Sequence, residues 1–307
     1  MAKGLYGIML YEFKRDLRKK TLILVIVFTF LPVLVAAILK AVGAQVEDER
    51  LWALIMGLDI GSSIAGGAVA SLGLAGWAWL VAVLYGGDLL ASDLREGGLR
   101  LIAIRPLGRK GYVMGKLIAL TAFLVIVFAL AGVAAGVSAT IVGGWQKGVW
   151  LAPILGALIG LGSVPTALIA SLFGGLTRNA VTGFILGAAA SLLTGVVIGL
   201  SLSIIIIKNP LSLEAWRKYY ELNIIVSGAI PITAGPTLPA ILYYLIEFDN
   251  KFIPLPLPLV ENPEVAASLV EVSLTPLEVL PLYIASTAIG ALALAYLNYR
   301  LALKIEV

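Results

Sequence analysis

The chain has 307 residues, of which 60% are hydrophobic and only 13% are charged, and its formal net charge is +4. Soluble domains carry about 25% charged residues, so this composition and several long uncharged runs predict a polytopic helical membrane protein. The sequence contains neither cysteine nor histidine, which excludes disulfides, thiolate chemistry and histidine ligands or acid–base groups. The lack of cysteine, with only two glutamines, is typical of a thermophile.

Residues 3–20 predict a basic amphipathic helix. Its apolar side recurs every fourth residue, with Leu5, Met9, Phe13 and Leu17, while basic residues such as Arg15 cover the other faces. A helix of this kind lies in the headgroup layer of a membrane with its apolar side down. The simpler alternative is a positively charged anchor for the first membrane span.

Six apolar runs are each long enough to cross a hydrocarbon core of ~30 Å at a rise of ~1.5 Å per residue. Their ranges are 21–42, 62–91, 113–142, 150–176, 180–207 and 279–300. With six spans, most of the 22 Lys and Arg residues fall on one side of the membrane. This distribution predicts a multi-pass plasma-membrane protein with both termini in the cytoplasm, in which residues 1–307 form one membrane domain.

The predicted outer segment covers residues 208–278. Residues 211–223 predict a short amphipathic helix, whereas 252–265 is rich in proline and predicts extended chain. The apolar stretch 222–246 contains three prolines and two glycines, which favour short, broken helices in a re-entrant or interfacial hairpin. A seventh span is the alternative, and it would place the C-terminus outside.

Four pairs of glycines, each separated by three residues, allow helices to approach closely. We expect them to serve packing within the chain rather than dimerisation. The pairs are Gly132/Gly136, Gly156/Gly160, Gly183/Gly187 and Gly195/Gly199.

A charged loop, residues 92–112, interrupts the apolar chain between the second and third predicted spans. Gly97-Gly98 breaks or caps a helix that enters from the second span, and Pro106 with Gly108 forces a turn. The pattern predicts a short surface helix whose apolar side chains rest on the bilayer or on a partner. The plain alternative is a loop that only satisfies the bias of positive charge toward the cytoplasm.

The sequence offers no pattern for catalysis or ion coupling. Gly115-Lys116 resembles the end of a phosphate-binding loop, but Lys110 and Leu117 occupy positions where that motif requires Gly and Ser or Thr. No paired carboxylates or nucleophile–base pair stand out, and no charged residue lies near the middle of a predicted span. We therefore expect a protein that is not an enzyme, binds no cofactor itself and is not an ion-coupled transporter.

The charged loop is similar to the cytoplasmic loop of the ABC type-2 permeases, the membrane subunits of many prokaryotic ABC exporters. In that family acidic residues precede Gly-Thr-Leu, an apolar stretch, Pro-x-Ser-Arg and a Gly-Lys that opens the third span. The matching residues are Asp93, Glu96, Gly97-Gly98-Leu99, Arg105-Pro106-Leu107-Gly108-Arg109 and Gly115-Lys116. Gly98 and Gly108 depart from the pattern, which has Thr and Ser there. The basic N-terminal helix with Glu12-Phe13 and Arg15, and the six-span layout, agree with the family.

The resemblance implies a permease driven by a separate ATP-binding subunit. Loop 93–110 would be a coupling helix, with Asp93, Glu96, Gly97, Leu99, Arg105, Pro106 and Arg109 at the ATPase. The turn Thr177-Arg178-Asn179 would make a second, smaller contact. ATP and Mg would bind only the partner. Two permease chains, identical or related, would assemble with two ATPases in membrane lipid, and no nucleic acid is expected.

Spans without charge favour an apolar or amphipathic substrate that leaves the cytoplasm or the inner leaflet, but the sequence does not name it. An importer permease is the nearest alternative, although the loop lacks the Glu-Ala-Ala order of common importers. A membrane scaffold or assembly factor would use the same loop to hold a soluble partner without ATP-driven motion. An ion-coupled secondary transporter is the least favoured alternative.

Overall fold

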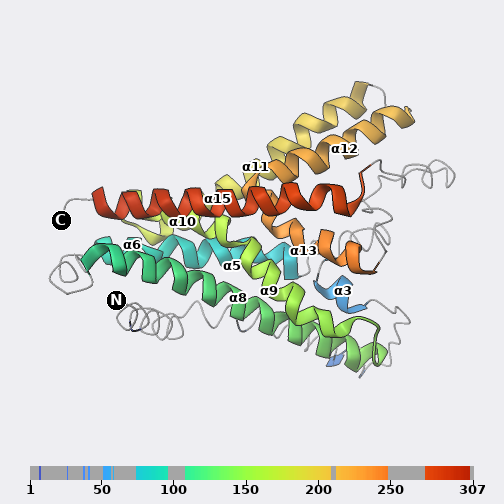
Figure 1. Ribbon diagram of the computed structural model, residues 1–307, viewed down its shortest axis with the longest axis horizontal. Helices are drawn as coiled ribbons and strands as arrows, with labels where there is room; N and C mark the ends of the chain where they lie inside the picture. Colours follow the sequence, from blue (N-terminus) through green and yellow to red (C-terminus); the bar gives the residue numbers. More distant parts are fainter. Residues whose placement is uncertain are drawn as a thin grey trace.

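The structure is a computed structural model of the 307-residue chain. It describes residues 51–56, 58, 74–95, 108–208, 212–247 and 274–304, with a few isolated positions before residue 51. All regular elements in these ranges are helices, which lie in an elongated bundle from which α11 and α12 project at one end (Figure 1). The all-α prediction is therefore confirmed.

The helices follow one another along the chain in three groups. The first part of the chain contributes α3 (Leu51–Met56), α5 (Leu74–Leu89), α6 (Ala91–Arg95) and α8 (Gly108–Gly143). The middle contributes the 3-10 turn η1 (Val149–Leu151), α9 (Ala152–Gly162), α10 (Val164–Thr177) and α11 (Ala180–Lys208). The last part contributes α12 (Leu213–Ala229), α13 (Pro231–Glu247) and α15 (Pro276–Lys304).

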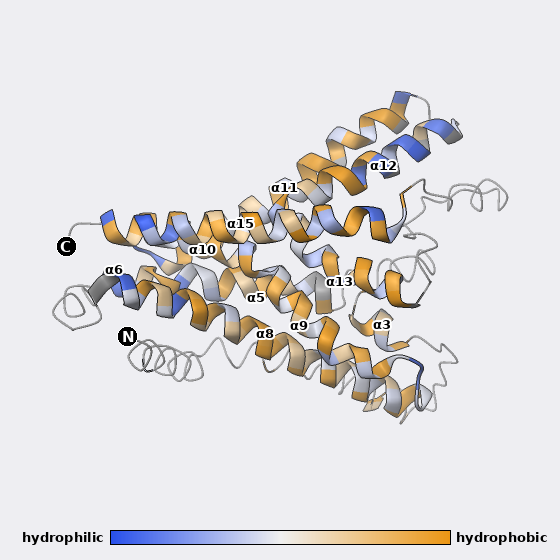
Figure 2. Cartoon of the chain, in the orientation of Figure 1, coloured by the Kyte–Doolittle hydropathy of each residue, from blue (hydrophilic) through white to orange (hydrophobic). Residues whose placement is uncertain are grey.

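The bundle has two ends, which we name after one residue each. The Asp93 end carries α6, the start of α8, the turn between α10 and α11 and the end of α15 (Figure 1). The Trp145 end carries α3, the loop between α8 and η1 and the start of α15. Colouring by hydropathy places hydrophilic residues mainly toward the tips of the long helices, with apolar stretches between them (Figure 2).

Four stretches in the described ranges are long and apolar enough to cross a membrane. They are Lys110–Gly143, Val149–Thr177, Ala180–Ile205 and Pro276–Lys304, and they correspond to the predicted third to sixth spans. The pair α12–α13 would add a fifth if it counts as one span. The N-terminal helix 3–20 and nearly all of the first span lie outside the described residues, and the second span is described only from Leu74. The chain is a transmembrane helical protein, and its total of six spans stays a prediction.

The pair α12–α13 is bent by 112° at Ile230, the geometry of a broken span or a re-entrant loop. At the bend, Pro231 lies against Gly290, near the middle of α15. Farther along α12, the carbonyl oxygen of Ile224 accepts a hydrogen bond of 3.1 Å from the Tyr283 hydroxyl. Ile241 of α13 belongs to the same apolar cluster as Tyr283. Both arms therefore contact the half of α15 that is nearer the Trp145 end.

The predicted breaks within 222–246 are only partly correct. Pro236 and Pro239 lie inside α13, and the helical path breaks only at Ile230, just before Pro231. A hydroxyl group supplies one donor that proline lacks at the break, since Thr233 Oγ1 donates at 2.8 Å to the Ser227 carbonyl, four residues before Pro231. Local side-chain bonds of this kind let a helix tolerate proline in an apolar setting. The prediction for 211–223 is confirmed by α12, which continues beyond it to Ala229.

Glycines set the closest helix contacts. A Cβ atom at Gly132, Gly156 or Gly160 would collide with the backbone of the facing helix, so α8 and α9 meet almost backbone to backbone. Gly183 and Gly187 similarly face the backbone of α10. Three of the four glycine pairs thus serve packing within the chain, as predicted. Gly195 of the fourth pair has no atom within 4 Å of a built Cβ.

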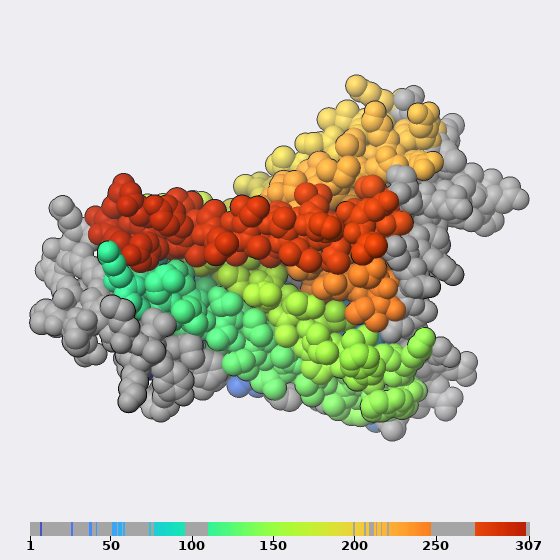
Figure 3. Space-filling view, in the orientation of Figure 1, coloured from blue at the N-terminus to red at the C-terminus, as the bar shows by residue number. Residues whose placement is uncertain are grey.

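The bundle leaves two of its long helices largely uncovered. We compared the most apolar 18-residue part of each stretch. In Val149–Thr177, 72% of that part is buried inside the structure, against 12% in Ala180–Ile205 and 22% in Pro276–Lys304. The outer face of α15 runs along the molecule in the space-filling view (Figure 3) and exposes Ile289, Leu292 and Leu297. Soluble monomers rarely expose continuous apolar surface of this extent, so lipid or another membrane protein must cover it.

Candidate functional site at the root of the charged loop

The charged loop is anchored by two helices at the Asp93 end. It leaves the bundle at the end of α6, whose last residue is Arg95, and returns at Gly108, the first residue of α8. Arg109 lies in the first turn of α8. The other predicted loop contacts lie outside the described residues, namely Glu96, Gly97, Leu99, Arg105 and Pro106.

A buried polar network joins α6 and α8, the two helices that flank the charged loop. Lys116 of α8 is fully buried and forms an ion pair with Oδ2 of Asp93, which is 7% exposed. The same carboxylate oxygen accepts a hydrogen bond of 2.7 Å from the Tyr112 hydroxyl. The Lys116 ammonium also donates to the carbonyl oxygen of Leu89 at 2.5 Å. One side chain of α8 thus holds both α6 and the last residue of α5.

The sequence places these groups together in a simple way. Tyr112 and Lys116 are four residues apart, so they lie on the same face of α8, and the ammonium is 5.3 Å from the centre of the Tyr112 ring. The carbonyls at the C-terminus of a helix attract cations, and Leu89 is the last residue of α5. Asp93 lies one helical turn beyond Leu89, so the ammonium reaches both groups.

The network fixes geometry more than it adds stability. Burying two charges removes them from water, and their mutual attraction offsets this penalty only when hydrogen bonds complete the geometry. Removal of one partner strands the other charge and costs about 3–5 kcal/mol, whereas an apolar pair of similar volume is often neutral. The Asp93–Lys116 pair therefore specifies how α6 is seated on α8.

The second predicted contact is a tight, exposed turn between α10 and α11. Arg178 has φ 54°, the only positive φ at a non-glycine residue in the described ranges. The Thr177 hydroxyl donates to the Phe173 carbonyl at 2.8 Å, and the Asn179 side chain accepts from the Val181 amide at 2.9 Å. Glycine is usual at this helix-terminal position. An arginine there costs about 1 kcal/mol of backbone strain, a feature enriched at functional sites.

Close glycine contacts connect this turn to the root of the loop. A Cβ atom on Gly174, in the last turn of α10, would collide with the carbonyl oxygen of Gly87 in α5. A Cβ atom on Gly183, in the first turn of α11, would lie 2.6 Å from the Cα of Gly174. The end of α5, the end of α10 and the start of α11 are therefore in backbone contact.

Asp93 and Arg178 were identified from the sequence, but the two residues that hold Asp93 were missed. The Asp93 carboxylate faces inward to Tyr112 and Lys116, so in this structure Asp93 positions α6 and does not offer an exposed docking group. The four-residue spacing of Tyr112 and Lys116 was visible in the sequence, but Arg109 and Lys110 open the same helix, so the spacing alone did not single out the network. That the predicted loop and turn residues contact an ATPase stays a prediction.

Comparison with known proteins adds no relative. No known protein family matches the chain, and no curated protein matches it. In the part of the chain that the structure describes, no group of three or more His, Cys, Asp or Glu residues could hold a metal ion. The functional interpretation therefore depends on the geometry of the Asp93 end and on the sequence pattern of the loop.

Proposed function

We propose that this chain is the membrane-spanning permease subunit of an exporter that a separate ATP-binding subunit drives. The observation that carries the proposal is the buried network of Asp93, Tyr112 and Lys116 at the root of the charged loop. A loop that only satisfies charge bias needs no buried ion pair at its base. A loop that transmits force must be rigidly connected to the helices that flank it.

The network provides a path for that force. A displacement of the loop reaches α6 and α8 together, because Lys116 joins Asp93 to the end of α5. The backbone contacts of Gly87, Gly174 and Gly183 then carry the motion from α5 into α10 and α11. The ATPase can shift the helices only by the difference in its docking free energy between its nucleotide states.

The proposed orientation follows from the basic residues. The Asp93 end carries Arg95, Lys110, Arg178, Arg300 and Lys304, which favours the cytoplasmic side. In this orientation α12 and α13 form a re-entrant hairpin that enters from the outer side. A soluble ATPase would meet both the loop and the Arg178 turn at one face.

The uncovered helices suggest where the other partners bind. The bare face of α11, on which Gly195 has open space beside it, offers a surface for a second permease chain, and lipid would cover the remaining apolar faces. The sequence has no charged residue near the middle of the described spans. An apolar or amphipathic substrate fits spans of this kind.

The test begins with a search of the neighbouring genes for an ATP-binding protein that has a phosphate-binding loop and no membrane spans, followed by reconstitution of that protein with this chain. Glu96→Ala, Arg105→Ala and Arg178→Gly should each lower the ATP turnover of the assembled complex several-fold at equal amounts of membrane subunit. Arg217→Ala is the matched control, because Arg217 is exposed on α12 and pairs with Glu221 one helical turn away. It should leave turnover unchanged.

Two other outcomes would decide against the proposal. If Glu96→Ala and Arg105→Ala leave both complex formation and turnover intact, the loop does not couple to the ATPase. If the two proteins assemble but wild-type and loop variants turn over ATP at the rate of the free ATPase, the chain acts as a scaffold.

A further inference from the structure

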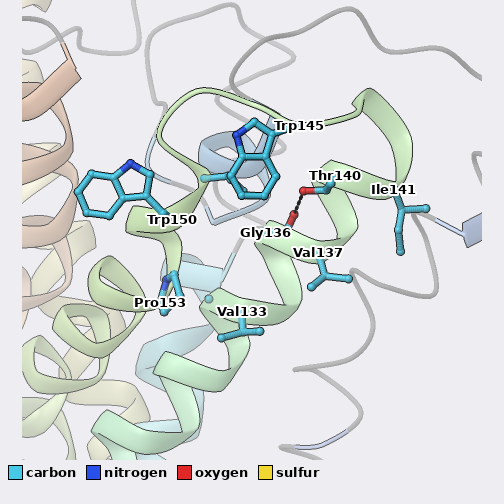
Figure 4. A pocket seen from close by; sticks show the side chains of 10 residues that line it. Val133, Gly136, Val137, Thr140, Ile141, Trp145, Trp150 and Pro153 are labelled. Atoms are coloured by element: carbon cyan, nitrogen blue, oxygen red, sulfur yellow. Dashed lines mark hydrogen bonds between the residues drawn. The ribbon is translucent and has the colours of Figure 1, made fainter.

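The Trp145 end contains an apolar groove that the proposed function does not use. The groove has a volume of about 550 Å³ and opens between α8 and the start of α9 (Figure 4). Its walls include Val133, Val137, Ile141, Trp145, Trp150 and Pro153. Two glycines of α8 that face the start of α9, Gly132 and Gly136, also line it.

The groove is formed in advance by the fold. The loop that closes it is fixed by Trp52, whose backbone amide donates to Gln146 Oε1 at 3.1 Å and whose indole donates to the Lys147 carbonyl at 3.0 Å. The hydroxyl of Thr140 donates to the Gly136 carbonyl of its own helix at 2.8 Å (Figure 4). A preformed site loses little conformational freedom when a ligand enters.

The surroundings of the groove identify the kind of ligand. It lies where two candidate membrane spans end, and its two indoles, Trp145 and Trp150, are 79% and 64% exposed. Tryptophan at the end of a span is typical of the membrane–water interface. Lys147 lies between these indoles in the sequence, is exposed, and is the only charged residue between Lys116 and Arg178. An apolar groove therefore ends beside a loop whose one charged residue is Lys147.

We propose that this groove holds one acyl chain of an anionic phospholipid, with the lipid phosphate beside the Lys147 ammonium. The chain would lie on Gly132 and Gly136, between the apolar walls of α8 and Pro153. The indole N–H groups of Trp145 and Trp150 are free to turn toward the ester and phosphate oxygens. This inference does not depend on the proposed transport function.

Charge, and not burial, must provide the selectivity. An acyl chain gains little when it moves from the bilayer into the groove, because lipid tails are as apolar as the groove walls. A lysine near an anionic surface contributes about 1 kcal/mol, which corresponds to an about fivefold preference for anionic over zwitterionic lipid.

Quenching of tryptophan fluorescence by brominated lipids can measure this preference. The wild-type chain is reconstituted into vesicles that contain either brominated phosphatidylglycerol or brominated phosphatidylcholine. The part of the signal that disappears in the Trp145→Phe/Trp150→Phe variant reports on the groove. We expect this part to be quenched with an about fivefold preference for phosphatidylglycerol.

Two pairs of variants separate the charge from the groove. Lys147→Gln should abolish the preference, whereas Lys208→Gln, which removes an exposed cation at the end of α11, should keep it. Val137→Phe narrows the groove and should reduce quenching by both lipids, whereas Ile126→Phe alters an exposed α8 residue that does not line the groove. Ile126→Phe should have no effect.

Each contrary result overturns a stated part of the proposal. Equal quenching by the two lipids, or a preference that survives Lys147→Gln, would mean that only ordinary surrounding lipid contacts the indoles. A preference that is lost in Lys147→Gln but unaffected by Val137→Phe would overturn the groove as the place of the acyl chain.

Discussion

At the Asp93 end, two opposite charges are buried and bonded to each other, whereas at the Trp145 end two exposed indoles and an exposed lysine stand beside an apolar groove. The first arrangement is directional, because an ion pair and its hydrogen bonds tolerate only one geometry. The loop at the Trp145 end is held by two hydrogen bonds from Trp52, and inside the bundle glycines let α9 and α13 approach their neighbours. A buried ion pair with fixed geometry suits an end that transmits motion, and an open apolar groove suits contact with lipid.

The largest expected effect on stability comes from breaking the buried ion pair of Asp93 and Lys116. Lys116→Met leaves the Asp93 carboxylate buried without its cation and should lower the free energy of unfolding by about 3–5 kcal/mol. Thermal unfolding in detergent, followed by loss of monodisperse protein, measures this change. The double variant Asp93→Leu/Lys116→Met should recover much of the stability, because no charge is stranded. An unchanged melting temperature for Lys116→Met would contradict the buried pair.

Removal of one hydrogen bond from the same network should have a smaller effect. Tyr112→Phe keeps the ring beside Lys116 and deletes only the hydroxyl that donates to Asp93. Hydrogen bonds to charged groups contribute about 1.5–3 kcal/mol, so unfolding should become easier by an amount in that range. The same thermal assay applies, with Tyr296→Phe on the exposed face of α15 as the control. Equal behaviour of the two variants would remove Tyr112 from the network.

The shape-based contacts should respond to added volume. A Cβ atom at Gly162 would collide with the backbone of Gly235, so Gly162→Ala should destabilise the fold by about 1–3 kcal/mol. Gly195→Ala is the matched control, because a Cβ there meets open space. Alanine is the better helix former, so this control should stabilise by up to about 1 kcal/mol. The same sign for both variants would contradict the packing of α13 on the α9–α10 junction.

The smallest expected effect on stability occurs at Arg178. Glycine adopts its left-handed backbone conformation without strain, so Arg178→Gly should leave stability unchanged or raise it by up to about 1 kcal/mol. The same variant should reduce coupled ATP turnover if the turn contacts the ATPase. Unfolding and turnover assays on one preparation separate the two effects. A parallel loss of stability and turnover would instead mark Arg178 as a structural residue.

The ends of the long helices could be predicted from sequence because charged residues or turn-forming residues interrupt the apolar runs. The predicted spans 150–176 and 180–207 differ from the observed helical stretches by at most one residue at either end. The prolines of α13 were harder to interpret, since Pro236 and Pro239 lie inside the helix without ending it and the helical path breaks only before Pro231.

The candidate site was predictable only in part. Charge density identified Asp93 and the loop, and a short gap between two apolar runs identified the Arg178 turn. The partners of Asp93 were missed because the sequence pattern does not reveal how α6 lies on α8. The left-handed conformation of Arg178 was also hidden, because Thr-Arg-Asn lacks the glycine that usually signals it. Contacts between distant helices thus define the part that sequence alone left open.

The most direct test of a cytoplasmic Asp93 end uses the absence of natural cysteines. Thr177→Cys and Lys147→Cys each place one thiol at an exposed position, at the Asp93 end and at the Trp145 end. In intact cells, an impermeant maleimide should label Lys147→Cys only. In opened membranes it should also label Thr177→Cys, and the bound ATPase should slow that reaction. Labelling of Thr177→Cys in intact cells would contradict a cytoplasmic Asp93 end and, with it, the proposed coupling to an ATPase.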